Sequence, residues 1–263
     1  MSRYNVSYHL ANASKPEDLI AETASGKGPS PALWSDCPYL ALALGAKEGF
    51  VFFDDFLGPI ETTTALDWTV TGVTTGRIVG VTTEQGGVLL VDSNGNTTSD
   101  DGVNVQRTNC LFKPAANRKI WFEARVKMND ATDQYFIGLA GVDTTLIAAG
   151  VVDDVVDKCG FYHEAASTDN KISAISSRLT SEEKNTDVGA NVDATYVKLG
   201  FKIDGLTRID FYRNGVIVAS VTDASDIPNA VMCLSAVAQI EVAGADAEMS
   251  IDWVRIAQEG GRS

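Results

Sequence analysis

Apolar and polar residues alternate with a period of two along most of the chain after Gly49. The alternation is clearest in residues 118–128, whose apolar face consists of Ile120, Phe122, Ala124, Val126 and Met128. The other face of this segment carries charged residues and Trp121. Residues 195–203 follow the same pattern. Because the side chains of a strand point alternately to its two faces, the pattern predicts strands with one face in a core and one in water.

A β-hairpin is predicted around Asn214-Gly215, because this pair favours a type I′ turn and separates two β-rich segments, 208–213 and 216–221. Further predicted strands cover residues 50–56, 77–83, 87–91, 134–142, 231–240 and 248–256. About a dozen short strands at hairpin spacing predict an all-β fold of antiparallel strands. The clean alternation favours a two-sheet sandwich over a barrel. Residues 180–184 are predicted to form a single helical turn.

The first 48 residues form a separate segment that is rich in Asn, Ser, Pro and Gly. Within it, Ser14-Lys-Pro-Glu17 matches a capping box and predicts one short helix. Large apolar residues of the segment are Tyr4, Tyr8, Leu10, Leu33, Trp34, Tyr39 and Leu40. They must pack either on the rest of the chain or on a neighbouring subunit. We therefore predict an N-terminal extended arm over residues 1–48 with partner-binding apolar residues, and a β-sandwich domain over residues 49–263.

The charge balance excludes two classes of partner. The 263 residues include 21 Lys and Arg against 35 Asp and Glu, which gives a net charge of −14. Nucleic acids and anionic membranes both require a basic surface, so neither is an expected partner. No secretory signal is visible, and the longest apolar run, residues 39–46, is too short to span a bilayer.

The four cysteines are scattered and form no CxxC pair. They are Cys37, Cys110, Cys159 and Cys233. A small secreted scaffold would have denser and more regular cysteines. We therefore expect all four to be reduced thiols that fill the core of a protein folded in the cytosol, and the alternative is a single disulfide.

Five segments together resemble a known fold. They are residues 52–56 with Trp68, 121–128 with 136–140, 160–162, 196–201 with 211–215, and 251–256. Over residues 50–257 the chain resembles the concanavalin A-like, laminin-G-like jelly roll. The resemblance implies a two-sheet antiparallel jelly-roll sandwich, a fold that serves lectins, glycosidases and structural modules. The whole chain also resembles virion proteins of tailed phages that carry such a jelly roll behind a short N-terminal arm.

Enzymatic signatures are missing from the sequence. Glycosidases on this fold place carboxylates at Glu-x-Asp-x-x-Glu spacing on one strand, so that they face one cleft. Here no Glu is followed by an Asp two residues later. Only two histidines, His9 and His163, could serve a Ser or Cys triad, and no Cys/His cluster suits zinc. We therefore predict no catalytic residues and no enzymatic activity.

Two weaker signals concern ligands. Residues 92–101 are rich in oxygen donors, and Asp92, Asn94, Asn96 and Asp100 are the candidate calcium ligands, although such residues also form ordinary turns. No other cofactor is indicated. Binding of a glycan would require exposed aromatic rings. The candidate rings are Trp68, Trp121, Trp253, Tyr162 and Tyr212, although an aromatic residue in a sandwich more often belongs to the core.

These observations predict a non-enzymatic structural virion protein, namely a capsid decoration or cement protein of a tailed phage. Its expected partners are the major capsid protein or other virion subunits and further copies of itself. Its expected location is the capsid surface, after synthesis in the host cytoplasm. The alternative is a carbohydrate-binding, lectin-like module, either attached to a virion or free. A glycoside hydrolase on the same fold is the third hypothesis.

Overall fold

The computed structural model describes residues 26–57, 67–72, 76–80, 86–95, 98–148, 151–152, 156–164, 170–241 and 246–260. Four residues with a predicted role, Tyr4, Tyr8, Leu10 and Asn96, lie outside these ranges. Within them, no helix is long and apolar enough to cross a membrane.

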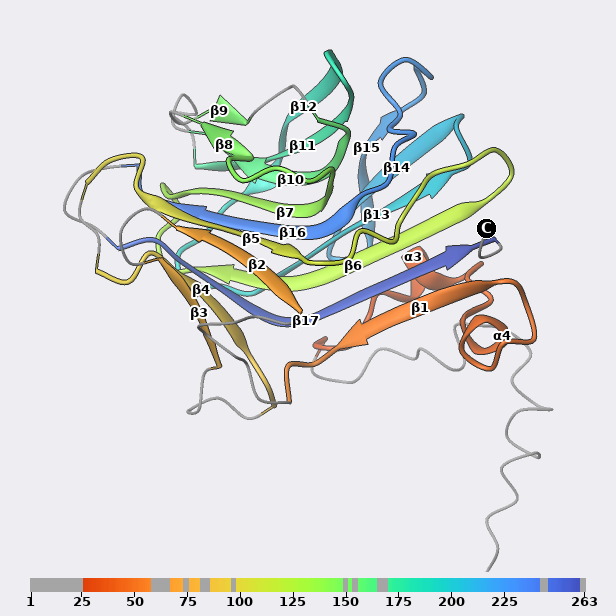
Figure 1. Ribbon diagram of the computed structural model, residues 1–263, viewed down its shortest axis with the longest axis horizontal. Coiled ribbons are helices and arrows are strands. Elements are labelled where there is room, and N and C mark those ends of the chain that lie inside the picture. Colours follow the sequence, from red (N-terminus) through yellow and green to blue (C-terminus); the bar gives the residue numbers. More distant parts are fainter. Residues whose placement is uncertain are drawn as a thin grey trace, which may run out of the picture.

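Two antiparallel sheets stack into a sandwich (Figure 1), as the sequence predicted. The eight-stranded sheet, called sheet A, has the order β15-β14-β13-β6-β17-β4-β3, and β1 also pairs with β17. Its strands are β1 (Gly49–Asp54), β3 (Arg77–Gly80), β4 (Leu89–Asp92), β6 (Lys119–Met128), β13 (Val197–Asp204), β14 (Arg208–Arg213), β15 (Val216–Val221) and β17 (Glu248–Glu259).

The seven-stranded sheet, called sheet B, has the order β12-β11-β10-β7-β16-β5-β2. Its strands are β2 (Trp68–Gly72), β5 (Gly102–Arg107), β7 (Gln134–Ala140), β10 (Lys158–His163), β11 (Lys171–Arg178), β12 (Ser181–Ala190) and β16 (Cys233–Gln239). A separate pair, β8 (Ile147–Ala148) and β9 (Val151–Val152), lies beyond the outer side of sheet B in Figure 1.

The local predictions are confirmed in two places and corrected in one. Strand β6 points Ile120, Phe122 and Ala124 into the core between the sheets, where Phe122 stacks on Phe201 with ring centroids 4.7 Å apart. Asn214 and Gly215 join β14 to β15 with positive φ angles of 49° and 78°, as a type I′ turn requires. The predicted helical turn at residues 180–184 is wrong, because this segment starts edge strand β12.

The arm packs on its own domain over residues 26–48. Helices α3 (Pro31–Trp34) and α4 (Tyr39–Ala43) lie beside β1 in Figure 1. They contribute to a second apolar cluster on the outer face of sheet A, which consists of Leu33, Trp34, Cys37, Leu42, Trp121, Tyr212 and Ala257. Leu33 and Trp34 are 0% and 1% exposed, so in this conformation they have no surface to offer a partner. Tyr39 stacks on Phe53, and Leu40 is half-buried.

Polar groups also hold the arm on sheet A. The buried carboxylate of Glu123 accepts hydrogen bonds from the Ser30 N–H (2.9 Å) and the Trp34 indole N–H (2.7 Å). Burial raises the pKa of Glu123, although these two donors counteract the effect. Asp36 accepts hydrogen bonds from Lys119 (2.7 Å) and from the indole of Trp121 (2.9 Å).

The expectation of four reduced thiols is wrong for Cys110 and Cys233, which form a disulfide. Phe112 and Met232 pair as an antiparallel bridge, and this pairing brings the two cysteines together from positions 123 residues apart. A bond over such a separation leaves no pattern in the sequence. Cys37 and Cys159 are free and buried, as expected.

Candidate functional site

The outer face of sheet B carries the candidate site, and a loop of the same chain partly covers this face. Phe136 and Ala140 of β7, Tyr162 of β10 and Val237 of β16 point away from the main core. Leu146, Ile147 and Val152, from the segment between β7 and β10, pack on them and complete a third apolar cluster with Ile175. This segment therefore fills the middle of the face.

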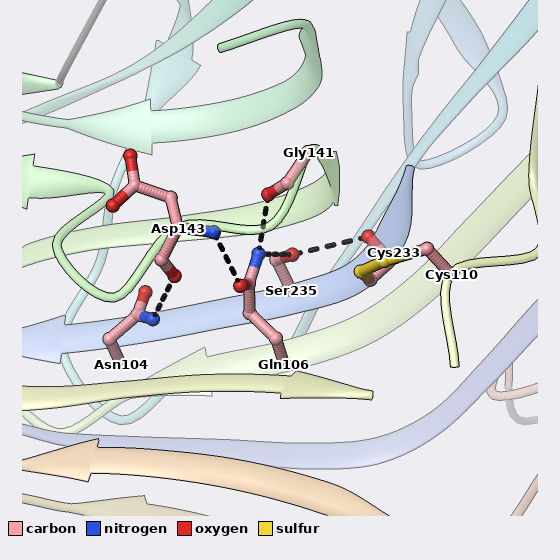
Figure 2. Close-up of a disulfide and its surroundings, with 7 residues drawn as sticks. All are labelled: Asn104, Gln106, Cys110, Gly141, Asp143, Cys233 and Ser235. Atoms are coloured by element: carbon pink, nitrogen blue, oxygen red, sulfur yellow. Dashed lines mark hydrogen bonds between the residues drawn. A yellow bond between two sulfur atoms is a disulfide. The ribbon is translucent and has the colours of Figure 1, made fainter. Parts of the chain in front are cut away.

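Side-chain amides of β5 hold the loop to the sheet (Figure 2). Gln106 donates its amide N–H groups to the carbonyl of Gly141 (2.9 Å) and to the hydroxyl of Ser235 (2.8 Å), while its Oε1 accepts the N–H of Asp143 (2.9 Å). Asn104 donates to the carbonyl of Asp143 (2.9 Å). Since Asn104 and Gln106 are buried, these bonds satisfy groups that would otherwise destabilise the fold.

A cavity of about 340 Å³ remains beside this anchor, between the loop and strands β2, β5 and β16. Its lining includes Thr71, Asp100, Asn104, Thr144, Thr145, Ile147, Val237 and Gln239. Hydroxyl, amide and carboxylate groups thus converge on one recess with a small apolar wall, a composition typical of a site for a polar small molecule.

Three amide oxygens at or beside this recess have no hydrogen-bond partner among the described residues, although all three are buried. They are Asn104 Oδ1, Gln239 Oε1 and Gln134 Oε1. Gln134 pairs with Gln239 across β7 and β16, and its N–H lies 3.4 Å from the carboxylate of Asp100. Unsatisfied buried acceptors are rare in folded proteins, because each one costs desolvation energy. The recess and its surroundings thus keep three hydrogen-bond acceptors unused within the described part of the chain.

A second polar group lies where β7 begins and β10 and β16 end. Asp133 is buried, and one of its carboxylate oxygens has no partner. Burial, together with the charge of Asp130, raises its pKa to about 7. His163 is fully buried too, with Nδ1 2.9 Å from the carbonyl of Lys171 and Nε2 3.9 Å from the carboxylate of Glu241. None of these described neighbours supplies a nucleophile for His163.

Of the predicted calcium ligands, the structure describes Asp92, Asn94 and Asp100. Asp92 bonds to Arg77 (2.9 Å) and to the N–H of Asn94 (2.5 Å), whereas Asp100 lines the recess on sheet B. The carboxylates close to Asp92 are instead those of Asp246 and Glu248, with ligand atoms within 4.8 Å of one another. Burial, with the charges of Asp92 and Asp246, raises the pKa of Glu248. Because calcium prefers oxygen donors, these three residues are the set that could hold a cation within the described part of the chain.

The aromatic residues considered for stacking on sugars are all buried. Trp121 does lie opposite the core face of β6, as predicted, but the arm covers it and it is 0% exposed. Trp253 donates its indole N–H to the carbonyl of Lys27 (2.9 Å). Tyr162 lies under the loop of sheet B. Trp68 and Tyr212 belong to the main core and to the cluster under the arm, respectively.

No protein-family model matches the sequence, and no curated protein matches it. Solved structures do match the fold. An endo-1,3-beta-glucanase from Streptomyces sioyaensis is 15% identical with a TM-score of 0.54, over 80% of this chain and 95% of that chain. Peanut lectin is 12% identical with a TM-score of 0.53, over 80% and 97%. A protein of unknown function from Shewanella oneidensis MR-1 is 14% identical with a TM-score of 0.55, over 82% and 89%.

These likenesses show that the chain has the jelly-roll sandwich fold of lectins and glycoside hydrolases. They contradict the prediction that the chain is not an enzyme. That prediction excluded glycoside hydrolases, and an endo-1,3-beta-glucanase has the same fold. The missing Glu-x-Asp-x-x-Glu spacing excludes one arrangement of carboxylates and does not exclude the class. The resemblance to phage virion proteins finds no support in these three structures.

Proposed function

We propose that this protein binds carbohydrate in the recess on the outer face of sheet B. The observation that carries the proposal is the set of three buried, unpartnered amide oxygens, Asn104 Oδ1, Gln134 Oε1 and Gln239 Oε1, at and beside one cavity. Asn104 and Gln239 line the cavity, so each of their oxygens can take a hydrogen bond from a sugar hydroxyl, and binding would then remove the cost of burying it without a partner.

The recess suits a neutral sugar better than a charged one. Among the described residues its lining contains one carboxylate, that of Asp100, and no basic residue, so an anionic sugar would be repelled. The threonine hydroxyls of Thr71, Thr144 and Thr145 can both donate to and accept from a polyol. Val237 and Ile147 offer an apolar patch for the C–H face of a ring.

The volume limits the ligand to a short one. A cavity of about 340 Å³ is near the lower end of the usual range for small-molecule sites, so one or two sugar units would fill it. The fold supports the same proposal, since both an endo-1,3-beta-glucanase and a lectin share it.

A glycan array probed with the full-length protein tests the proposal, followed by calorimetric titration of the best neutral glycan. We expect Asn104→Leu and Gln239→Leu each to weaken binding by about tenfold or more, because each removes an acceptor from a desolvated site. Thr71→Ala should also weaken binding. Its matched control, Thr69→Ala, should not, since both residues lie on β2 and only Thr71 lines the recess. A protein that binds no glycan, or variants that bind as well as wild type, would contradict the proposal.

The same samples can be assayed for release of reducing ends from any glycan that binds.

The predicted partners in a virion and the predicted capsid location stay predictions. Their main physical argument was an arm free to reach a neighbour, and residues 26–48 of that arm lie on their own sheet.

A further inference from the structure

Strand β1 leaves one of its two edges unpaired. It pairs only with β17 among the described strands, and the N–H of Gly260 bonds to the carbonyl of Glu48 (2.9 Å). In an antiparallel ladder this register turns the backbone groups of Phe50 and Phe52 toward β17. Those of Val51 and Phe53 therefore point to the open side, where no backbone group among the described residues bonds to them.

An apolar groove of about 780 Å³ runs along this open edge. Its walls include Phe50, Val51 and Phe52 on one side, and Leu111 and Val231 on the other. Leu111 and Val231 are 56% and 44% exposed, which is unusual for large apolar side chains on adjacent segments. All six residues of β1 are only half-buried. Lys113 and Arg118 also line the groove, and no described strand covers this edge of β1.

The first ten residues of the chain have the pattern of a strand that could cover such an edge. Apolar residues stand at Tyr4, Val6, Tyr8 and Leu10. Polar residues stand between them at Arg3, Asn5, Ser7 and His9. An alternation of this kind, apolar on one face and polar on the other, is typical of a strand that lies half-buried on a core.

The path of the chain allows this segment to reach the groove. The carbonyl of Lys27 accepts the indole N–H of Trp253, and the next residue of β17, Val254, pairs with Asp54 at the end of β1. The described chain thus begins beside β1. Residues 11–25 then span up to about 50 Å when extended, well beyond the length of a six-residue strand.

We propose that residues 3–10 add to the free edge of β1 in the same molecule as a further strand of sheet A. Backbone groups of Val51 and Phe53 would bond to the added strand. Tyr4, Val6, Tyr8 and Leu10 would enter the groove against Phe50, Phe52 and Leu111. The polar side chains between them, from Arg3 to His9, would face water. The N-terminal segment would then lie over the groove along β1.

Hydrogen exchange of the full-length protein tests this inference at two amides. The Val51 and Phe53 amides should exchange slowly in the wild type. They should exchange at least about tenfold faster in Val6→Lys/Tyr8→Lys, because positive charges on the groove side would meet Lys113 and Arg118 and expel the strand. Asn5→Lys/Ser7→Lys is the matched control, with equal charge on the opposite face, and it should keep the protection. Binding of the dye ANS should rise only in the first double variant.

A second variant changes the groove and leaves the arm intact. Leu111→Arg replaces an exposed side chain, so it should fold normally and still speed up exchange at Val51 and Phe53. Rapid exchange of both amides in the wild type would overturn the proposal, as would equal effects of the two double variants. Protection that increases with protein concentration would also overturn it, since the strand would then come from a second copy.

Discussion

The outer faces of the two sheets are both covered by segments of the same chain, but in different ways. On sheet A the arm inserts large side chains, and Trp34 fits between Phe53 and the carboxylate of Glu123. On sheet B the loop after β7 rests on a small apolar cluster and is held by the amides of Asn104 and Gln106. The first cover leaves the hydroxyl of Ser30 as its one buried side-chain group without a partner among the described arm residues, whereas the second leaves amide oxygens without partners next to a cavity.

This difference separates a structural cover from a functional one. A face that only needs protection from water gains most from tight apolar packing, as under the arm. A face that binds a ligand must keep acceptors available and accept the loss of stability that follows. We therefore expect changes under the arm to alter mainly folding, and changes around the recess to alter mainly binding.

The largest loss of stability should come from Trp34→Ala. This change removes a fully buried indole and one of the hydrogen bonds to Glu123, so the free energy of unfolding should fall by about 3–5 kcal/mol. Urea denaturation of the purified protein measures it. Leu44→Ala, at a 70% exposed position of the same arm, should change it by less than about 0.5 kcal/mol. A small effect of Trp34→Ala would mean that the arm is not a structural cover.

The second-largest loss of stability should come from breaking the disulfide between Cys110 and Cys233. It closes a loop of 123 residues beside the anchored loop of sheet B, and its reduction should cost about 2–5 kcal/mol. Thiol titration under denaturant without reductant should return two thiols, those of Cys37 and Cys159. The double variant Cys110→Ser/Cys233→Ser should be insensitive to reductant. A titration that returned four thiols would contradict the bond.

Asp133→Asn should stabilise the protein in a pH-dependent manner. In the folded state the Asp133 pKa is raised from 3.8 to about 7. Protonated Asp133 therefore contributes to the stability of the folded state. This contribution is complete below pH 3.8 and is lost as the pH rises through 7. At pH 8 the Asn variant should be more stable than wild type by about 2–4 kcal/mol, and at pH 4 the two should be alike. Melting curves across this range test it, and a pH-independent difference would contradict the raised pKa.

A smaller loss of stability than that of the arm or the disulfide should come from Gln106→Leu, at about 1–3 kcal/mol. The change deprives Gly141, Asp143 and Ser235 of their partner, so the amides of residues 141–148 should exchange faster while the sandwich stays folded. Asn104→Leu, which removes only the bond to the Asp143 carbonyl, should cost less. Unchanged exchange in the Gln106 variant would mean that the apolar cluster alone holds the loop.

Much of the fold could be predicted where one face of a strand is apolar. The alternation in β6 and the Asn-Gly turn between β14 and β15 are local signals, and both predictions are confirmed. Strand β12 could not be predicted in this way, because its sequence SEEKNTDVGA is polar on both faces, as an edge strand permits. The cover over Trp121 could not be predicted either, since periodicity assigns a residue to a face and does not say what lies on that face.

The candidate site could not be predicted from spacing. Asn104 and Gln106 alternate with Val103 and Val105, which does reveal a polar face on β5. The partners Gln134 and Gln239 come from β7 and β16, and only the strand order β7-β16-β5 brings the three amides together. Catalytic carboxylates and stacking aromatic rings leave recognisable patterns along a chain. Amides, which interact with ligands through hydrogen bonds alone, have no characteristic spacing to search for.

The strand order also fixes when folding can occur during synthesis. In sheet A, β17 separates β1, β3 and β4 from β6, and in sheet B, β16 separates β2 and β5 from β7. Both joining strands come from the last 31 residues of the chain, from Cys233 onward. At roughly 5–20 residues per second, the ribosome needs about 10–50 s to reach them. Until then β6 lacks its link to β4, and β7 lacks its link to β5, so neither sheet can be completed.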